Sequence, residues 1–332
     1  MKIFVFYSPQ ILLNYNKTLL VDQFKRNNNL YSDHNYDINF CPFDDCTQFC
    51  NSLYKKMKSN KNHYVHSVFW MHLKIGSYVL TMKNFTNLLQ DFHIKTIFWM
   101  DDLHFARGNM LFDERYKYSD LIISPSTEYF ENIKSPYLNK TKFLFYYFDE
   151  YFIEEYNPDI TFNARKNKIL LTGNISDSYN SRQQMLTNSY THTHLYDVLT
   201  HPGYYNLTHK FYHKEYFNKL SEYKGSIVGL ANHPLNFLLG KIIEVIGSGC
   251  IGFFEESPLY EEKLGLKPWI HYVPIEKNKY NQLNFENIAY HDLLISHHGK
   301  KIAQTAYNHI KENYNSLTCS AQIINILKDN FL

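Results

Sequence analysis

The chain has 332 residues, enough for two domains that each enclose a core of ordinary size. Hydrophobic residues make up 44% of the sequence, a globular proportion that excludes general disorder. The formal net charge of +2 is too balanced for a protein that binds nucleic acid or another polyanion by electrostatics alone.

The five cysteines form no familiar metal-binding or disulfide pattern. Cys41, Cys46 and Cys50 cluster, but their spacing fits no common zinc site, and we expect the reduced thiols of a cytosolic protein. The segment 1–7 is too short and too quickly polar for a signal peptide. No apolar run approaches the roughly 20 residues of a membrane span. We therefore expect a cytoplasmic protein.

The first half of the chain predicts strands that alternate with helices. Short apolar runs predict strands at 2–7, 67–71, 96–100, 121–124 and 142–145, and the segments between them predict helices at 41–59, 78–92 and 126–133. This alternation is typical of a parallel α/β sheet. From Asp149 to Arg165 the sequence loosens into a polar stretch, where we place a domain boundary.

A second α/β series follows this boundary. It predicts strands at 168–172, 225–230, 250–254 and 269–274, and helices that start near Ser181 and cover 214–224, 300–314 and 320–329. A further helix is predicted from Asn232, which is a suitable cap, through Pro234 in the first turn to Gly247 and Gly249 at its end.

Lys241 and Glu244 are three residues apart, so they lie on one face of this predicted helix. A cation and a carboxylate near the end of a parallel strand suit a ligand that carries both phosphate and hydroxyl groups. The alternative interpretation is an ordinary solvated ion pair, which is the more frequent explanation of an isolated Lys-x-x-Glu.

Other candidate binding residues also follow predicted strands, and parallel sheets bind ligands beyond the carboxyl ends of their strands. Gly173 and Asn174 come after the first strand of the second half, where a glycine lets a phosphate approach the backbone. Arg182 lies near a helix N-terminus, which favours an anion. Arg182 and Lys241 could together neutralise a diphosphate, while Glu244 accepts hydrogen bonds from a hydroxyl group. A structural arginine and a structural glycine turn are the alternatives.

Asp101, Asp102 and His104 directly follow a predicted strand of the first half, where a catalytic loop belongs. The imidazole of His104 can act as a general base near neutral pH, and Asp102 could orient it. The alternatives are an Asx-type turn and a packed histidine. The aspartates are not a spaced D-x-D pair, and no acidic cluster indicates an obligatory metal ion.

The segment 241–251 resembles the R/K-x-x-E-x-x-A-x-G-x-hydrophobic segment of glycosyltransferases with two Rossmann-like domains (GT-B), in particular the glycosyl transferase family 1 C-terminal domains. Segments 169–183 and 201–204 are similar to a second pattern in some of these enzymes, and 299–314 to their closing helix. The resemblance implies an α/β fold of two parallel sheets. It assigns residues 1–155 to an acceptor-side domain, 156–316 to a nucleotide-sugar-binding domain and 317–332 to a closing helix.

The resemblance also implies the activity. Such enzymes move a sugar from a nucleoside-diphosphate sugar, here UDP- or GDP-linked, to a glycan, protein or other hydroxyl acceptor, and they usually need no metal. Glu244 would contact the sugar or ribose, Arg182 and Lys241 would hold the diphosphate, and Gly173 would leave room for it. His104 would face the acceptor or the donor sugar.

Asn236 departs from the family pattern, because retaining members have a glutamate at this position. The stereochemical outcome of transfer therefore stays open. Two other classes of protein also stay open, a nucleotide-sugar epimerase on the same fold and a non-catalytic sugar- or nucleotide-binding protein. The near-neutral charge disfavours a DNA-glucosylating enzyme.

Overall fold

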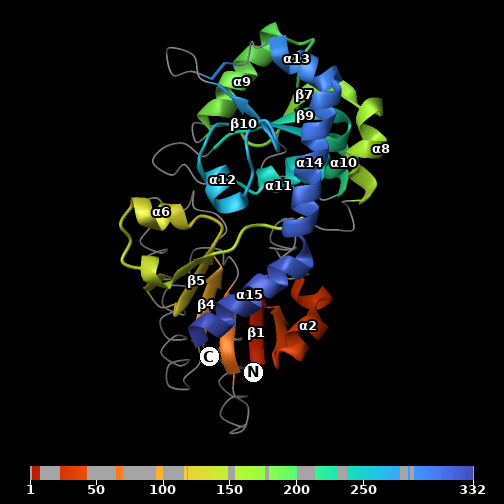
Figure 1. Cartoon of the computed structure of the whole chain (residues 1–332). Coiled ribbons are helices and arrows are strands. Elements are labelled where there is room, and N and C mark those ends of the chain that lie inside the picture. Colours follow the sequence, from red (N-terminus) through yellow and green to blue (C-terminus); the bar gives the residue numbers. More distant parts are fainter. Residues whose placement is uncertain are drawn as a thin grey trace. The chain divides into compact units, whose positions relative to one another are not determined.

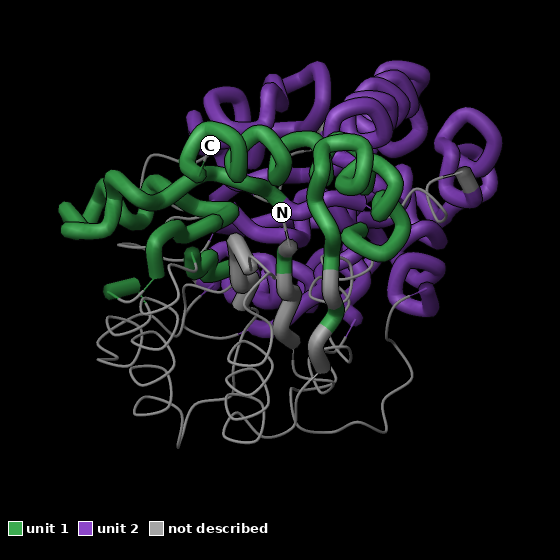
Figure 2. The backbone as a smooth tube through the Cα atoms, turned by 90° about the horizontal axis from the view of Figure 1, so that it is seen from below, with its two compact units in different colours: residues 1–145, 316–332 green, residues 146–315 purple. Residues whose placement is uncertain are grey.

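The computed structural model describes residues 2–7, 23–42, 65–70, 95–99, 116–117, 119–148, 154–175, 179–199, 214–230, 238–276, 283–284 and 288–331. The chain divides into two compact units. Unit 1 comprises residues 1–145 and 316–332, and unit 2 comprises residues 146–315 (Figure 2). Each unit contains its own parallel sheet.

Unit 1 is built on a six-stranded sheet with the order β2-β1-β3-β4-β5-β6, in which all described pairings are parallel (Figure 1). The strands are β1 (Lys2–Tyr7), β2 (Asp37–Pro42), β3 (Val65–Trp70), β4 (Lys95–Trp99), β5 (Leu121–Ser124) and β6 (Thr141–Phe143). The helices are α2 (Asn28–Asp33), α6 (Thr127–Asn132), the short η3 (Leu138–Lys140) and α15 (Ser316–Phe331). Strand β5 is buried along its whole length, as expected for an apolar strand inside a parallel sheet.

The C-terminal helix α15 belongs to unit 1, although it follows unit 2 in the sequence. It covers the helix predicted over 320–329 and begins earlier, at Ser316. Its larger buried side chains recur at helical spacing, which gives the helix one face that packs on the rest of the unit. These side chains are Cys319, Ile323, Ile324 and Leu327.

Hydrogen bonds tie α15 to the N-terminal part of unit 1. The Asn27 side-chain amide donates to the Ser316 carbonyl oxygen over 3.1 Å. The hydroxyl groups of Ser320 and Tyr31 both donate to the side-chain oxygen of Gln23. The C-terminal helix therefore packs against the N-terminal part of unit 1 (Figure 1).

Unit 2 contains a five-stranded parallel sheet with the order β11-β10-β9-β7-β8. Its strands are β7 (Lys166–Leu171), β8 (Tyr196–Val198), β9 (Tyr223–Val228), β10 (Ile251–Glu255) and β11 (Val273–Ile275). Its helices are η4 (Glu154–Tyr156), α8 (Pro158–Thr161), η5 (Phe162–Ala164), α9 (Asn180–Thr191), α10 (Lys214–Ser221), α11 (Lys241–Gly247), α12 (Leu259–Leu264), α13 (Ile288–Ile295) and α14 (His297–Asn313). Helix α14 packs on α11, α13 and α8 (Figure 1).

Two glycines, one at the end of α11 and one between α11 and β10, are required by close packing. A Cβ atom at Gly247 would lie 2.5 Å from the Phe148 ring, so the end of α11 has no room for a side chain. Gly249 has a φ of +72°, and a Cβ atom there would overlap the carbonyl oxygen of Tyr156. The glycines that end the predicted helix therefore have a structural role.

The helix predicted from Asn232 begins only at Lys241, and residues 238–240 are not helical. Asn232 and Pro234 lie outside the described residues. Gly240 occupies the N-cap position, and its carbonyl oxygen accepts from the Ile243 N–H over 3.1 Å. Glycine is a poor residue for a helix interior, which explains why the helix starts after it. As a result Glu244 lies in the first turn, where the helix dipole favours a carboxylate.

The helix predicted over 41–59 is wrong at its start, because Cys41 and Pro42 end strand β2. Apolar Ile38 and Phe40 alternate with polar residues in this strand, and Ile38 pairs with Ile3 of β1. This alternation is the period of a strand at a sheet edge. Residues 43–59 and the predicted helix at 78–92 lie outside the described residues.

The strand predicted over 269–274 begins only at Val273, because a tight turn precedes it. Trp269 in this turn has a φ of +62° and is 42% exposed. Its N–H donates to the Tyr272 carbonyl oxygen over 2.7 Å, and the Lys267 N–H donates to His271 Nδ1 over 2.9 Å. A left-handed conformation is costly for a bulky residue, so these bonds hold the turn against local preference.

His271 should make the stability of the protein sensitive to acid. Burial, with smaller effects of His309 and Lys267, lowers the pKa of His271 from 6.5 to about 4. Between these two values the unfolded chain binds more protons than the folded one, so the free energy of unfolding should fall as the pH falls from 6.5 to 4. Because the ring is partly exposed, we expect a loss of about 1 kcal/mol.

The variant His271→Asn tests this expectation, because an asparagine oxygen can accept the Lys267 N–H and does not titrate. Urea unfolding at a series of pH values should show a smaller acid loss for the variant than for the wild type. Equal acid losses in the two proteins would show that another group is responsible.

None of the helices in the part of the chain that the structure describes combines the length and apolar character that crossing a bilayer requires.

Candidate functional site

Four predicted binding residues lie at the carboxyl edge of the unit 2 sheet. Gly173 and Asn174 follow the end of β7, and Arg182 lies in the first turn of α9. Lys241 is the first residue of α11, which follows β9 along the chain. In parallel sheets this edge is where ligands bind.

Arg182 is buried, with 4% of its surface exposed. Its guanidinium carbon lies 3.9 Å from the centre of the Tyr179 ring, and Nη1 donates to the Asn174 carbonyl oxygen over 2.9 Å. Gly173 has a φ of +91°, and a Cβ atom there would lie 2.9 Å from Nη1 of Arg182. The space above Gly173 is therefore taken by the guanidinium group, and the three residues form one arrangement.

Lys241 and Glu244 form an ion pair with 2.9 Å between Nζ and Oε2. Only 12% of the lysine side chain and 14% of the glutamate side chain are exposed. The alternative interpretation of the sequence, a solvated ion pair, is therefore wrong. The two residues do pair, but the pair is largely buried. Burying two charges is costly unless further polar contacts satisfy them.

Tyr216 of α10 supplies such a contact and was not predicted from the sequence. Its hydroxyl group accepts a hydrogen bond from Lys241 Nζ and lies 2.8 Å from Thr172 Oγ1, at the end of β7. Lys241 Nζ also lies 4.3 Å from the centre of the Tyr216 ring, in a cation–π arrangement. Among 29 tyrosines in the chain, no sequence signal marks this one.

The pKa of Lys241 reflects these neighbours. Burial lowers it, but Glu244 and Tyr216 raise it more, so the pKa lies above its ordinary value and the ammonium group stays charged. Arg182 lowers the pKa of Lys241, which means that the two cations are close enough to repel each other. Burial raises the pKa of Tyr216, so its hydroxyl group is neutral. The charges of Arg182, Lys241 and Glu244 sum to +1, which suits an anion.

The remaining predicted residues, Asp102, His104 and Asn236, lie outside the described residues. In the described part of the chain, no group of three histidine, cysteine or acidic side chains is arranged to hold a metal ion.

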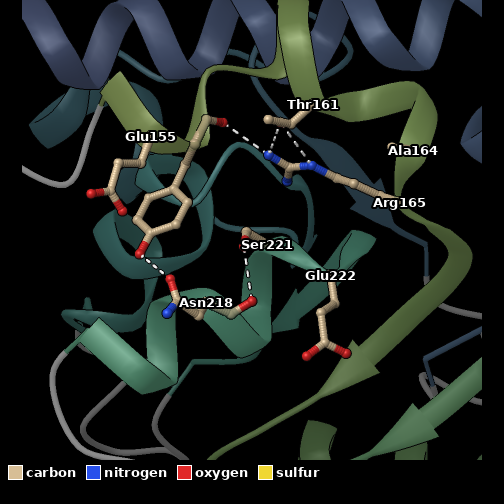
Figure 3. Close-up of a pocket in the computed structure, with 8 residues that line it drawn as sticks. Glu155, Thr161, Ala164, Arg165, Asn218, Ser221 and Glu222 are labelled. Carbon is tan, nitrogen blue, oxygen red and sulfur yellow. Dashed lines mark hydrogen bonds between the residues drawn. The ribbon is translucent and has the colours of Figure 1, made fainter.

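A separate polar cavity of about 330 Å³ lies near the starts of β7 and β9, at the opposite edge of the unit 2 sheet (Figure 3). Arg165 in its wall donates to the Tyr156 carbonyl oxygen and to Thr161 Oγ1, and the Tyr156 hydroxyl donates to Asn218 Oδ1 over 2.8 Å. These groups satisfy one another (Figure 3), so the cavity wall has a structural explanation.

No protein-family model matches the sequence, and no curated protein matches it significantly. The structure is similar to a glycosyltransferase from Rickettsia africae ESF-5, with a TM-score of 0.60, 9% sequence identity and coverage of 99% of this chain and 98% of that chain. The two proteins share a fold. An α1,3-fucosyltransferase with GDP-fucose gives a TM-score of 0.45 at 14% identity, covering 100% of this chain and 90% of that one. A protein from O. sativa in complex with UDP gives 0.44 at 8% identity, with 100% of both chains covered.

The sequence resemblance to GT-B glycosyltransferases is thus confirmed at the level of the fold. Both sheets are parallel, and the chain covers nearly the whole length of the Rickettsia protein.

Proposed function

We propose that this protein is a glycosyltransferase that moves a sugar from a nucleoside-diphosphate sugar to a hydroxyl acceptor. One observation carries the proposal. Arg182 and Lys241 place two buried cations at the ligand-binding edge of unit 2, within a fold shared with a glycosyltransferase. Unit 2 is accordingly the proposed donor-binding domain.

The proposed donor site uses both signs of charge. Arg182 and Lys241 neutralise the diphosphate and stabilise the charge that develops on it as the sugar leaves. A carboxylate can accept several hydrogen bonds, so Glu244 is the proposed partner of a ribose or sugar hydroxyl. The two cations serve in place of a divalent metal ion, which makes metal-independent transfer the proposed mode.

The sequence alone supports three further residue roles and the choice of nucleotide. His104 is the proposed general base, Asp102 its orienting carboxylate, and Asn236 a donor contact where retaining relatives have a glutamate. A UDP- or GDP-linked donor is the expectation from the sequence resemblance.

A panel of UDP-, GDP-, ADP- and TDP-sugars tests the donor site through thermal stability. A ligand at about 100 times its dissociation constant adds roughly 2.7 kcal/mol to the free energy of unfolding. We expect one nucleotide family to stabilise the wild type, and the added stability to be lost in Arg182→Ala and in Glu244→Ala. Each variant is compared with its own ligand-free form, so that a change in intrinsic stability does not enter.

Lys168→Ala is the matched control, because this lysine pairs with Asp197 away from the cluster and should keep the ligand-induced shift. If no nucleotide-sugar stabilises the wild type, the transferase proposal fails. A shift that survives in both site variants would place the donor elsewhere.

A further inference from the structure

A hydrogen-bonded row of three polar side chains connects the residue after β7 with α10 and α11 at the proposed donor site. Lys241 Nζ donates to the Tyr216 hydroxyl oxygen, and that oxygen lies 2.8 Å from Thr172 Oγ1. Thr172 is 1% exposed, so the row is shielded from bulk water at this end. Thr172 directly precedes Gly173, and Lys241 begins α11.

These three side chains carry more hydrogen atoms that can be donated than oxygen atoms that can accept them. An ammonium group has three N–H donors. Glu244 and Tyr216 each take one from Lys241, and no side chain in the described ranges accepts the third. Tyr216 and Thr172 carry two hydroxyl hydrogens, of which their mutual hydrogen bond uses one. The described residues provide no acceptor for the other.

Two donors are thus unfilled within the described ranges, and buried donors of this kind are costly unless acceptor oxygens are supplied, as a ligand would supply them. A diphosphate has such oxygens, whereas a cation or an apolar group has none. The surplus of hydrogen-bond donors therefore favours an anionic ligand, as does the positive charge of the Arg182 and Lys241 cluster.

We propose that Tyr216 is a positioning residue for this site, and that it fixes the Lys241 ammonium group so that its remaining N–H points to a diphosphate oxygen. This inference rests on the proposed donor site. The hydroxyl of Tyr216 sets one direction of the ammonium group, Glu244 sets a second, and the ring of Tyr216 supports the charge from 4.3 Å. Such pre-organisation lowers the entropic cost of binding.

The test is a double-mutant cycle on the affinity for UDP and GDP, measured by titration calorimetry. Tyr216→Phe keeps the ring and removes the hydroxyl group, and it should weaken binding about tenfold. In the background of Lys241→Met, which itself weakens binding, Tyr216→Phe should change the affinity less than about twofold, because the group that it positions is gone.

Tyr156→Phe is the matched control, since it removes a tyrosine hydroxyl group at the opposite edge of the same sheet and should leave the affinity unchanged. Thr172→Val is a second variant that leaves Tyr216 whole and should weaken binding about threefold.

Equal losses from Tyr216→Phe in the two backgrounds would overturn the inference, because they would mean a general structural effect. An unchanged affinity in Tyr216→Phe would overturn it as well, while the donor site itself would stand. Absence of binding by the wild type would instead refute the proposed function and remove the basis for the inference.

Discussion

Replacing Arg165 by methionine should lower the free energy of unfolding by about 3 kcal/mol. The buried guanidinium group donates to the Ser248 carbonyl oxygen over 2.8 Å, to the Tyr156 carbonyl oxygen over 2.9 Å and to Thr161 Oγ1 over 2.6 Å. Methionine fills part of the volume but donates nothing, so the buried carbonyl oxygens of Ser248 and Tyr156 would lose this donor. Urea unfolding at pH 7 measures the loss.

Lys166→Met is the control for Arg165→Met, because it removes a cation from the next position. Lys166 pairs with Glu222 in an exposed ion pair, and its loss should cost about 0.5 kcal/mol or less. Similar losses for the two variants would contradict the account of Arg165. The result also bears on the site, because Arg165 holds the turn that follows α11.

Replacing Lys241 by methionine should lower the free energy of unfolding by about 3 kcal/mol, because it leaves the Glu244 carboxylate nearly buried without its cation. Chemical unfolding at pH 7 measures the loss.

The double variant Lys241→Met/Glu244→Leu separates stability from binding. Replacing a whole buried ion pair by apolar side chains is often nearly neutral, so the double variant should unfold within about 1 kcal/mol of the wild type. It should nevertheless bind no nucleoside diphosphate. Recovery of binding together with stability would show that the pair is only structural.

The regular parts of the fold could be predicted because their signals are local. Strand β5 is a short apolar run, β7 ends in one, and the resemblance of the 241–251 segment indicated the fold. The start of α11 could not be placed, because the cap residues around Asn232 suggested an earlier start than Gly240 allows.

The site could be predicted in part for the same reason. Lys241 and Glu244 meet because a helical spacing of three residues places them together wherever the helix begins. Tyr216 and Arg165 act through partners distant in sequence, and only the packing of α10, α11 and η4 brings them there. Burial of the ion pair is a tertiary property in the same sense, since the pattern Lys-x-x-Glu occurs equally on exposed helices.

The most direct test of the donor site is a crystal structure of the protein with UDP or GDP bound. We expect diphosphate oxygens within hydrogen-bonding distance of the Arg182 guanidinium group and the Lys241 ammonium group. A nucleotide whose diphosphate lies away from both cations, for example in the cavity beside Arg165, would contradict the account.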